Sequence, residues 1–195
     1  LALTDGGLSQ LLRVWRSEIV VEGLILAETD RIALATVLAI KSPEQADQIV
    51  TRQLAEIDNT DRQRRFDWIR PALSPDPLAR KAFFETLAEE DNRAVESWVI
   101  GALDALHHPL RRGDAEAYIL PSLELLEEIQ ITGDIFFPAR WLEATLGRHN
   151  SPAAAAVVRG FLAQRPDYNR QLRLKILQAA DILFRAERLL SLSNF

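Results

Sequence analysis

The 195-residue sequence contains no cysteine and no methionine, and its only imidazoles are those of three histidines. Without cysteine the chain can form no disulfide, no thiolate nucleophile and no cysteine-ligated zinc or iron–sulfur site. The eight glycines are scattered, and neither a phosphate-binding glycine loop, nor a dinucleotide fingerprint, nor a G-x-S-x-G turn occurs. The zinc-binding pattern HExxH is also absent. We therefore predict no catalytic residue, no metal ligand and no cofactor in this chain.

The sequence also lacks an excess of positive charge and any long apolar run. Its 28 acidic and 23 basic residues give a net charge of −5, which disfavours binding to the phosphates of a nucleic acid. No apolar stretch approaches the roughly 18 residues that a membrane-spanning helix needs. The start does not show the basic segment followed by an apolar one that is typical of a signal peptide. We predict neither a nucleic-acid partner nor a membrane span.

Apolar residues recur at helical spacing along nearly the whole chain. One such stripe steps by three and four residues and comprises Val95, Trp98, Val99, Ala102, Leu103 and Leu106. Sustained alternation of apolar and polar residues, which would indicate strands, is absent. The spacing therefore predicts an all-α protein.

Capping residues and prolines divide this pattern into short helices. Pro71 should stop one helix, and Pro121 should kink or divide another. Because the connecting loops are short, consecutive helices should pack as antiparallel pairs. We expect helices over 8–16, 30–41, 43–57, 60–70, 76–88, 92–106, 115–131, 138–147, 152–164 and 169–188. The expected pairs are 30–57, 60–88, 92–131 and 138–164, with 169–188 as a terminal helix.

The expected domain organisation follows from these pairs. Residues 1–28 are interpreted as the tail of a helix followed by an extended connector over 17–28. Residues 29–195 are expected to form a HEAT- or armadillo-like domain, in which antiparallel helix pairs stack into a right-handed superhelical array. The alternative is one continuous domain over 1–195.

Basic and aromatic side chains near the loops are the candidates for ligand binding. Arg111 and Arg112 follow helix 92–106, and Arg140 begins helix 138–147 beside the apolar loop 132–138. Guanidinium groups lining a groove would bind carboxylates, including the one at the C-terminus of a peptide. Otherwise the arginines pair with acidic residues and the aromatic residues belong to the core. The candidate peptide-binding residues are Arg111, Arg112, Arg140, Phe136, Phe137 and Trp141.

The histidines give no sign of a shared site. His107 and His108 are adjacent and should close helix 92–106, where an imidazole can bond the last carbonyls. No spacing places His149 with either of them on one helix face. We expect three unclustered imidazoles.

Several segments together resemble the C-terminal region of bacterial M1-family zinc aminopeptidases, over roughly residues 30–187. The resemblance implies an all-helical domain that curves over a catalytic domain and closes a substrate chamber. The HExxH and Gly-x-Met-Glu-Asn motifs of that family's catalytic domain are missing here, so no catalytic or zinc-binding residue carries over. The segments are PSLELLEEIQITGDIFFPARWLEATLG (121–147), ESWVIGALDALHHPLR (96–111), RRFDWIRP (64–71), HNSPAAAAVVRGFLAQRPDY (149–168) and LRLKILQAADILFRA (172–186).

The resemblance implies a non-catalytic domain whose partners are the parent's own catalytic domain, which would hold the zinc, and a peptide substrate. The alternative is a stand-alone helical-repeat scaffold that binds a protein or peptide. A reading frame continuing far upstream of Leu1 and encoding HExxH would indicate the first, and a start codon just before Leu1 the second. The 20 arginines against 3 lysines suggest a GC-rich bacterial genome, whereas a cytoplasmic or exported location does not follow from the sequence.

Overall fold

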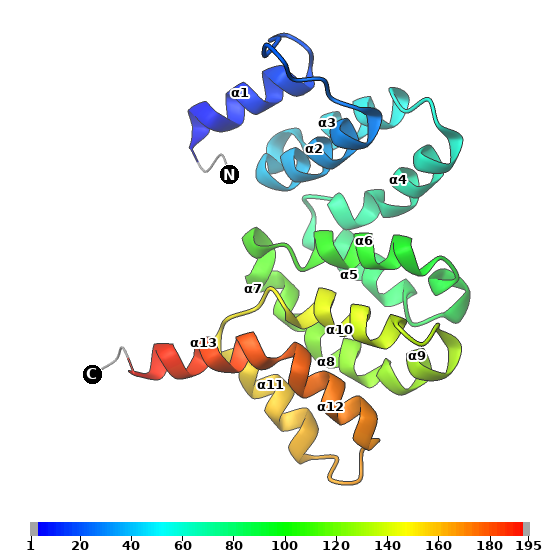
Figure 1. Ribbon diagram of the computed structural model, residues 1–195, viewed down its shortest axis with the longest axis vertical. Helices are drawn as coiled ribbons and strands as arrows, with labels where there is room; N and C mark the ends of the chain where they lie inside the picture. Colours follow the sequence, from blue (N-terminus) through cyan, green and yellow to red (C-terminus); the bar gives the residue numbers. More distant parts are fainter. Residues whose placement is uncertain (1–3, 193–195) are drawn as a thin grey trace. The chain divides into compact units, whose positions relative to one another are not determined.

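The computed structural model describes residues 4–192, and every regular element in this range is helical (Figure 1). The prediction of an all-α protein is therefore confirmed. The chain divides into two compact units, Leu1–Phe83 and Phe84–Phe195. The expected domain ranges begin at residue 1 and end at residue 195, and residues 1–3 and 193–195 lie outside the described residues.

The first unit is organised around the packing of α2 on α3. The short turn between them begins at Ser42-Pro43, where the expected helix 43–57 starts, and α4 packs on α3 and α2. The Asn59 side chain starts α4 by accepting hydrogen bonds from two backbone N–H groups. The elements are α1 (Asp5–Trp15), α2 (Glu28–Lys41), η1 (Pro43–Gln45), α3 (Ala46–Ala55) and α4 (Thr60–Leu73), with α5 (Pro77–Thr86) crossing into the second unit.

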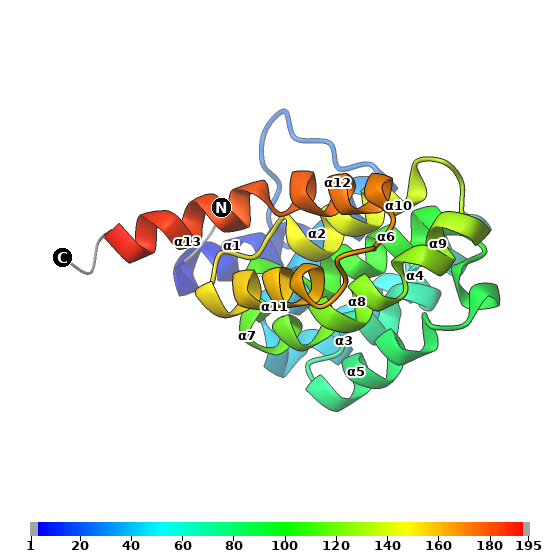
Figure 2. The same ribbon diagram turned by 90° about the horizontal axis from the view of Figure 1, so that it is seen from below.

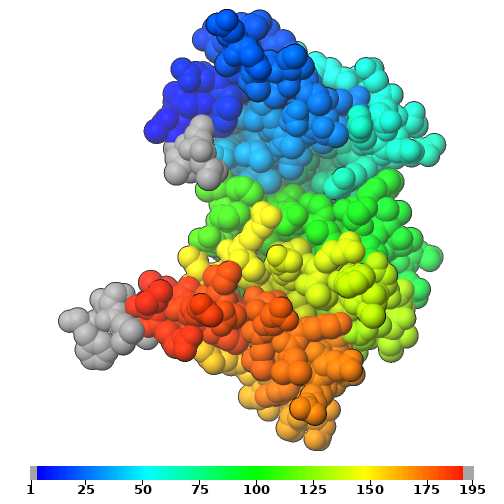
Figure 3. All heavy atoms as spheres, viewed as in Figure 1, coloured from blue at the N-terminus to red at the C-terminus, as the bar shows by residue number. Residues whose placement is uncertain are grey.

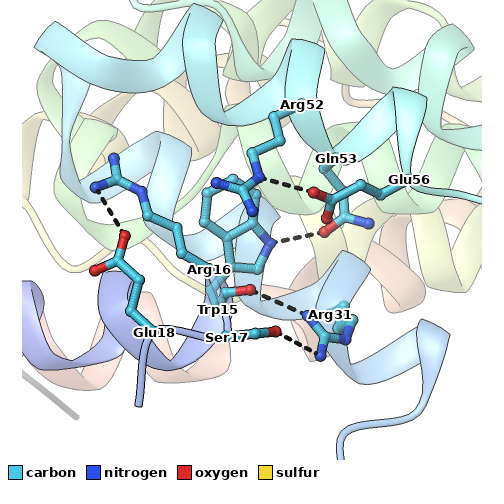
Figure 4. A network of polar contacts seen from close by, with 8 residues as sticks. All are labelled: Trp15, Arg16, Ser17, Glu18, Arg31, Arg52, Gln53 and Glu56. Carbon is cyan, nitrogen blue, oxygen red and sulfur yellow. Dashed lines mark hydrogen bonds and ion pairs between the residues drawn. The ribbon is translucent and has the colours of Figure 1, made fainter.

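Trp15 attaches α1 to the rest of the first unit (Figure 4). Its side chain is 1% exposed, and its indole N–H donates to Gln53 Oε1 on α3 over 2.7 Å. The Arg52 guanidinium lies 5.3 Å from the ring centroid. Arg31 of α2 donates to the Trp15 carbonyl over 3.1 Å and to the Ser17 hydroxyl over 3.0 Å. These contacts place α1 in the same unit as α2 and α3.

The segment 16–27 between α1 and α2 has no regular secondary structure. It turns back at Gly23, whose φ of 78° is accessible to glycine at little cost. The Leu24 N–H donates to the Val21 carbonyl over 3.0 Å and closes this turn. Several of its apolar side chains are exposed: Val20, Val21, Leu24 and Ile25.

The second unit has two layers of helices (Figures 1 and 2). In one layer α10 packs on α6 and on α12, and in the other α8 packs on α11. The main partners of α10 are thus α6 and α12, whereas the expected pair 138–164 would have placed it chiefly on α11. The elements are η2 (Glu90–Arg93), α6 (Glu96–Leu106), η3 (Pro109–Arg111), α7 (Arg112–Ala115), η4 (Glu116–Tyr118), α8 (Ile119–Glu124), α9 (Leu126–Thr132), α10 (Phe137–Leu146), α11 (Pro152–Ala163), α12 (Arg170–Ala179) and α13 (Asp181–Leu192).

Several helix boundaries differ from the expectation. Helix α4 continues through Pro71 to Leu73, so Pro71 lies in the last turn and does not stop the helix. The segment 115–131 is divided upstream of Pro121 and again at Leu125, between α8 and α9. Pro121 thus lies in the first turn of α8, where its missing N–H has no intrahelical partner to lose. The final helix is broken at Ala180 into α12 and α13.

The apolar stripe of residues 95–106 is buried only in part. Val99, Ala102, Leu103 and Leu106 are in the core. Val95 precedes the first turn of α6 and is exposed, and Trp98 is half-buried. The periodicity therefore identified the helix correctly, but not where its buried face begins.

Candidate functional site

The layer formed by α6, α10 and α12 carries a groove of about 750 Å³ in the second unit. Figure 3 shows the face that α10, α12 and α13 present. Small side chains on α10 and α12, including Ala139, Ala144 and Ala179, leave room for the groove between the helices. Its lining residues are Ile100, Asp104, Ala139, Arg140, Glu143, Ala144, Gly147, Arg148, Lys175, Gln178, Ala179, Asp181 and Ile182.

Charges of both signs line this groove. Arg148 donates to Asp104 Oδ1 over 2.7 Å, and the Lys175 ammonium donates to Gln130 Oε1 over 2.9 Å. Burial raises the pKa of Asp104, and the nearby Glu143 carboxylate raises it further, whereas Arg148 opposes both effects. A groove with this lining can hold the backbone and the charged groups of an extended chain.

Arg140 is the one candidate binding residue from the sequence that lines the groove. It lies in the first turn of α10, and its side chain is about half exposed. Its Nη2 lies 3.9 Å from Asp134 Oδ2, which is at the limit of an ion pair. An exposed pair of this kind contributes about 0–1 kcal/mol, so Asp134 competes only weakly with another carboxylate.

The other two candidate arginines lie away from the groove lining. Arg111 is 9% exposed in η3. Arg112 donates from Nε to the Arg148 carbonyl over 2.7 Å and so holds the turn that follows α10. The Arg112 guanidinium, which the sequence suggested as a partner for a ligand carboxylate, therefore donates to a backbone carbonyl of the same chain.

The three candidate aromatic residues separate into core and surface. Phe137 and Trp141 are buried, with their rings edge to face at a centroid distance of 6.0 Å. The Trp141 indole N–H donates to the Ser122 carbonyl over 3.1 Å. Both side chains thus contribute to the packing of α10, the alternative stated above, and neither lines the groove. Phe136 is 64% exposed on the loop before α10.

The loop before α10 is fixed by Asp134 and Gly133. Asp134 Oδ1 accepts from the N–H groups of Phe136 and Phe137 over 2.6 and 3.0 Å and so begins α10. The Asp134 N–H donates to Glu96 Oε1 over 2.6 Å. A Cβ at Gly133 would lie 2.6 Å from Phe137 Cδ1 and 2.9 Å from the Ile129 carbonyl oxygen. Glycine is therefore required here by close approach.

We expect Gly133→Ala to lower the free energy of unfolding by about 1–3 kcal/mol, because the added methyl group must displace a buried ring or a helix carbonyl. Gly113→Ala is the matched control. No atom lies within 4 Å of a Cβ at Gly113, and alanine is the better helix former by about 1 kcal/mol. Urea titrations of both variants test this, and equal midpoints would contradict it.

The structure brings together two histidines that the sequence did not connect. His107 Nδ1 lies 2.9 Å from His149 Nε2, and the two residues are 42 positions apart. His107 is the C-terminal capping residue of α6, as expected, but its imidazole contacts His149 rather than the last carbonyls of that helix. The neighbouring His108 accepts a hydrogen bond at Nδ1 from the Leu110 N–H. The expectation of three unclustered imidazoles is therefore wrong. No spacing signals this pair, because it depends on the packing of α6 against the turn after α10.

Among residues 4–192, no group of three or more metal-ligating side chains is placed to hold a metal ion. In the same range no helix combines the length and apolar character that crossing a membrane requires. Comparisons of the chain with protein-family models, with curated proteins and with solved structures gave no match.

Proposed function

We propose that this chain is the non-catalytic C-terminal helical domain of an M1-like metallo-aminopeptidase, and that its groove takes the part of a peptide substrate remote from the reacting end. The observation that carries the proposal is the groove over α6, α10 and α12 with the half-exposed Arg140 in its lining. The sequence resemblance over residues 30–187 supports the family. In the parent protein the domain would close the substrate chamber, and zinc would belong to the catalytic domain.

Peptide binding follows from the chemistry of the groove. Its small residues admit a peptide backbone, and its charges of both signs suit side chains of either sign. Arg140 can hold a peptide's terminal carboxylate by charge-assisted hydrogen bonds, which contribute about 1.5–3 kcal/mol. The weak contact with Asp134 leaves the guanidinium able to exchange partners.

We expect Arg140→Ala to weaken the binding of a fluorescein-labelled peptide of about ten residues by about tenfold or more when the peptide ends in a free carboxylate. The same peptide with an amidated C-terminus should bind both proteins equally. Arg64→Ala is the control, because Arg64 is 70% exposed, lies in the first unit and also contacts an aspartate weakly. Fluorescence anisotropy on the whole chain measures the affinities. An equal loss for both peptides, or no binding of either, contradicts the role of Arg140.

The alternative is a stand-alone helical-repeat scaffold. It would bind a protein or peptide in the same groove but would not belong to a larger aminopeptidase. A reading frame upstream that encodes HExxH supports the aminopeptidase domain, and its absence supports the scaffold. In a parent enzyme, Arg140→Ala should lower kcat/KM for a long peptide and leave a dipeptide unaffected, because only the long substrate reaches the groove.

A further inference from the structure

Two buried imidazoles join the end of α6 to the turn between α10 and α11. His107 is 0% exposed and His149 is 1% exposed. Their facing nitrogens are 2.9 Å apart, and the rings are nearly perpendicular, with centroids 5.2 Å apart. The pair is not part of the groove lining. The two imidazoles themselves are therefore not among the residues proposed to contact a peptide.

The number of protons on the pair decides whether the contact can exist. Two neutral imidazoles carry two N–H groups and two lone pairs, and the shared hydrogen bond uses one of each. The outer nitrogens, His107 Nε2 and His149 Nδ1, are buried without a hydrogen-bond partner among the described residues. One added proton still leaves an N–H facing a lone pair. When both imidazoles are protonated, each of the two facing nitrogens carries a hydrogen and neither can accept, so the hydrogen bond is lost.

The groups around the pair favour its neutral form. His107 faces the Tyr118 ring edge-on at 5.9 Å and lies in the field of Arg148. Burial, then His149 and Arg148, lower the pKa of His107 from 6.5 to about 3. Burial also lowers the pKa of His149.

Two charged groups act on His149 with opposite signs. The Glu116 carboxylate favours its protonated form, whereas Arg112 disfavours it. Glu116 already accepts a hydrogen bond from the Ser151 hydroxyl over 2.5 Å. Among the charged groups of residues 4–192 that act most strongly on the two rings, Glu116 alone favours a proton, and it does so on His149.

We propose that His107 and His149 form an acid-sensitive clasp that holds the α10–α11 turn against α6 and opens when both rings are protonated. The direction of the pH dependence follows from the protons that each form binds. In the open form the imidazoles regain their ordinary affinity for protons, so acid favours that form. The closed form is therefore fully populated above about pH 6.5 and is progressively lost as the pH falls below that value. Opening would also release Arg148 and its carbonyl, which hold Asp104 and Arg112.

Hydrogen exchange on the whole chain tests the clasp. After correction for the intrinsic pH dependence of exchange, the opening constant around 107–111 and 147–151 should rise about 16-fold between about pH 6.5 and pH 5 for each histidine that is protonated only when open. The α2–α3 pair should show no such rise. His108→Gln is the matched control, because it removes the third imidazole and should leave the rise unchanged. His149→Gln should make it smaller.

Imidazole proton NMR of the wild-type protein gives a test that needs no core variant. His108 is identified by the loss of its signal in His108→Gln. The His107 signal should remain that of a neutral ring down to about pH 5 and change only with opening. A free titration of either His107 or His149 near pH 6.5, without a rise in exchange, would overturn the proposal. So would a rise in exchange that is equal in wild type and His149→Gln.

Discussion

Replacing Trp141 with alanine is expected to lower the free energy of unfolding of the second unit by about 3–5 kcal/mol. The Trp141 side chain is fully buried on α10, the helix that packs on α6, α8, α9 and α12. Truncation leaves a cavity at the meeting point of both helix layers and deprives the Ser122 carbonyl of its donor. Denaturant unfolding followed by far-UV circular dichroism measures the loss without relying on tryptophan fluorescence.

Trp141→Phe is the matched variant, because it keeps most of the ring volume and removes the indole N–H. We expect it to cost about 1–2 kcal/mol, from one lost buried hydrogen bond and a smaller cavity. A cost below about 1 kcal/mol for Trp141→Ala would mean that the indole contributes little to the core. Trp141 would then return to the candidates for ligand binding.

Helix positions could be predicted from the sequence because they depend on local signals. The expected helices 43–57, 60–70 and 152–164 begin in the structure at Ser42-Pro43, Asn59 and Ser151-Pro152, where a proline or a capping side chain marks the start. The break at Ala180 carries no comparable signal, since neither glycine nor proline is present there. The choice of α6 and α12 as the main partners of α10 was also not visible, because it depends on contacts between distant residues.

The candidate site was harder to predict because the same side chain suits two roles. Arg140 and Arg112 look alike in sequence, yet Arg140 lines a groove and Arg112 donates to a backbone carbonyl. Phe136 and Phe137 are adjacent, yet one is exposed and the other is buried, since consecutive residues at a helix start point in different directions. Which of two equivalent residues faces solvent is decided by the packing of the second unit.

Two buried arginines make the same local contact with the backbone. Arg80 and Arg93 are each 3% exposed. The Arg80 Nη1 donates to the carbonyls of Ser74 and Pro75, six and five residues earlier, both over 2.8 Å. The Arg93 Nη1 donates to the carbonyls of Leu87 and Ala88, at the same two spacings, over 2.6 and 2.8 Å. In both cases the guanidinium satisfies carbonyls that follow the end of a helix.

Arg93→Met is expected to lower the free energy of unfolding by about 2–4 kcal/mol. Methionine keeps much of the buried volume but leaves the Leu87 and Ala88 carbonyls without their donor. The contact with Leu87 is buried and the contact with Ala88 is partly buried, and an unsatisfied buried acceptor costs about 1–3 kcal/mol. The ion pair of Arg93 Nη2 with Glu128 is lost as well. Because the Glu128 side chain is 45% exposed, water can solvate its carboxylate, so most of the expected loss comes from the carbonyls.

Two further variants separate these contributions. Glu128→Gln removes the ion pair but keeps both carbonyl contacts, and it should cost less than about 1 kcal/mol. Arg70→Met removes an exposed arginine that lies 3.3 Å from Asp67, and it should change the stability by no more than about 0.5 kcal/mol. Urea unfolding compares all three. If Glu128→Gln costs as much as Arg93→Met, the ion pair rather than the backbone contact makes Arg93 necessary, and the shared spacing with Arg80 has no energetic meaning.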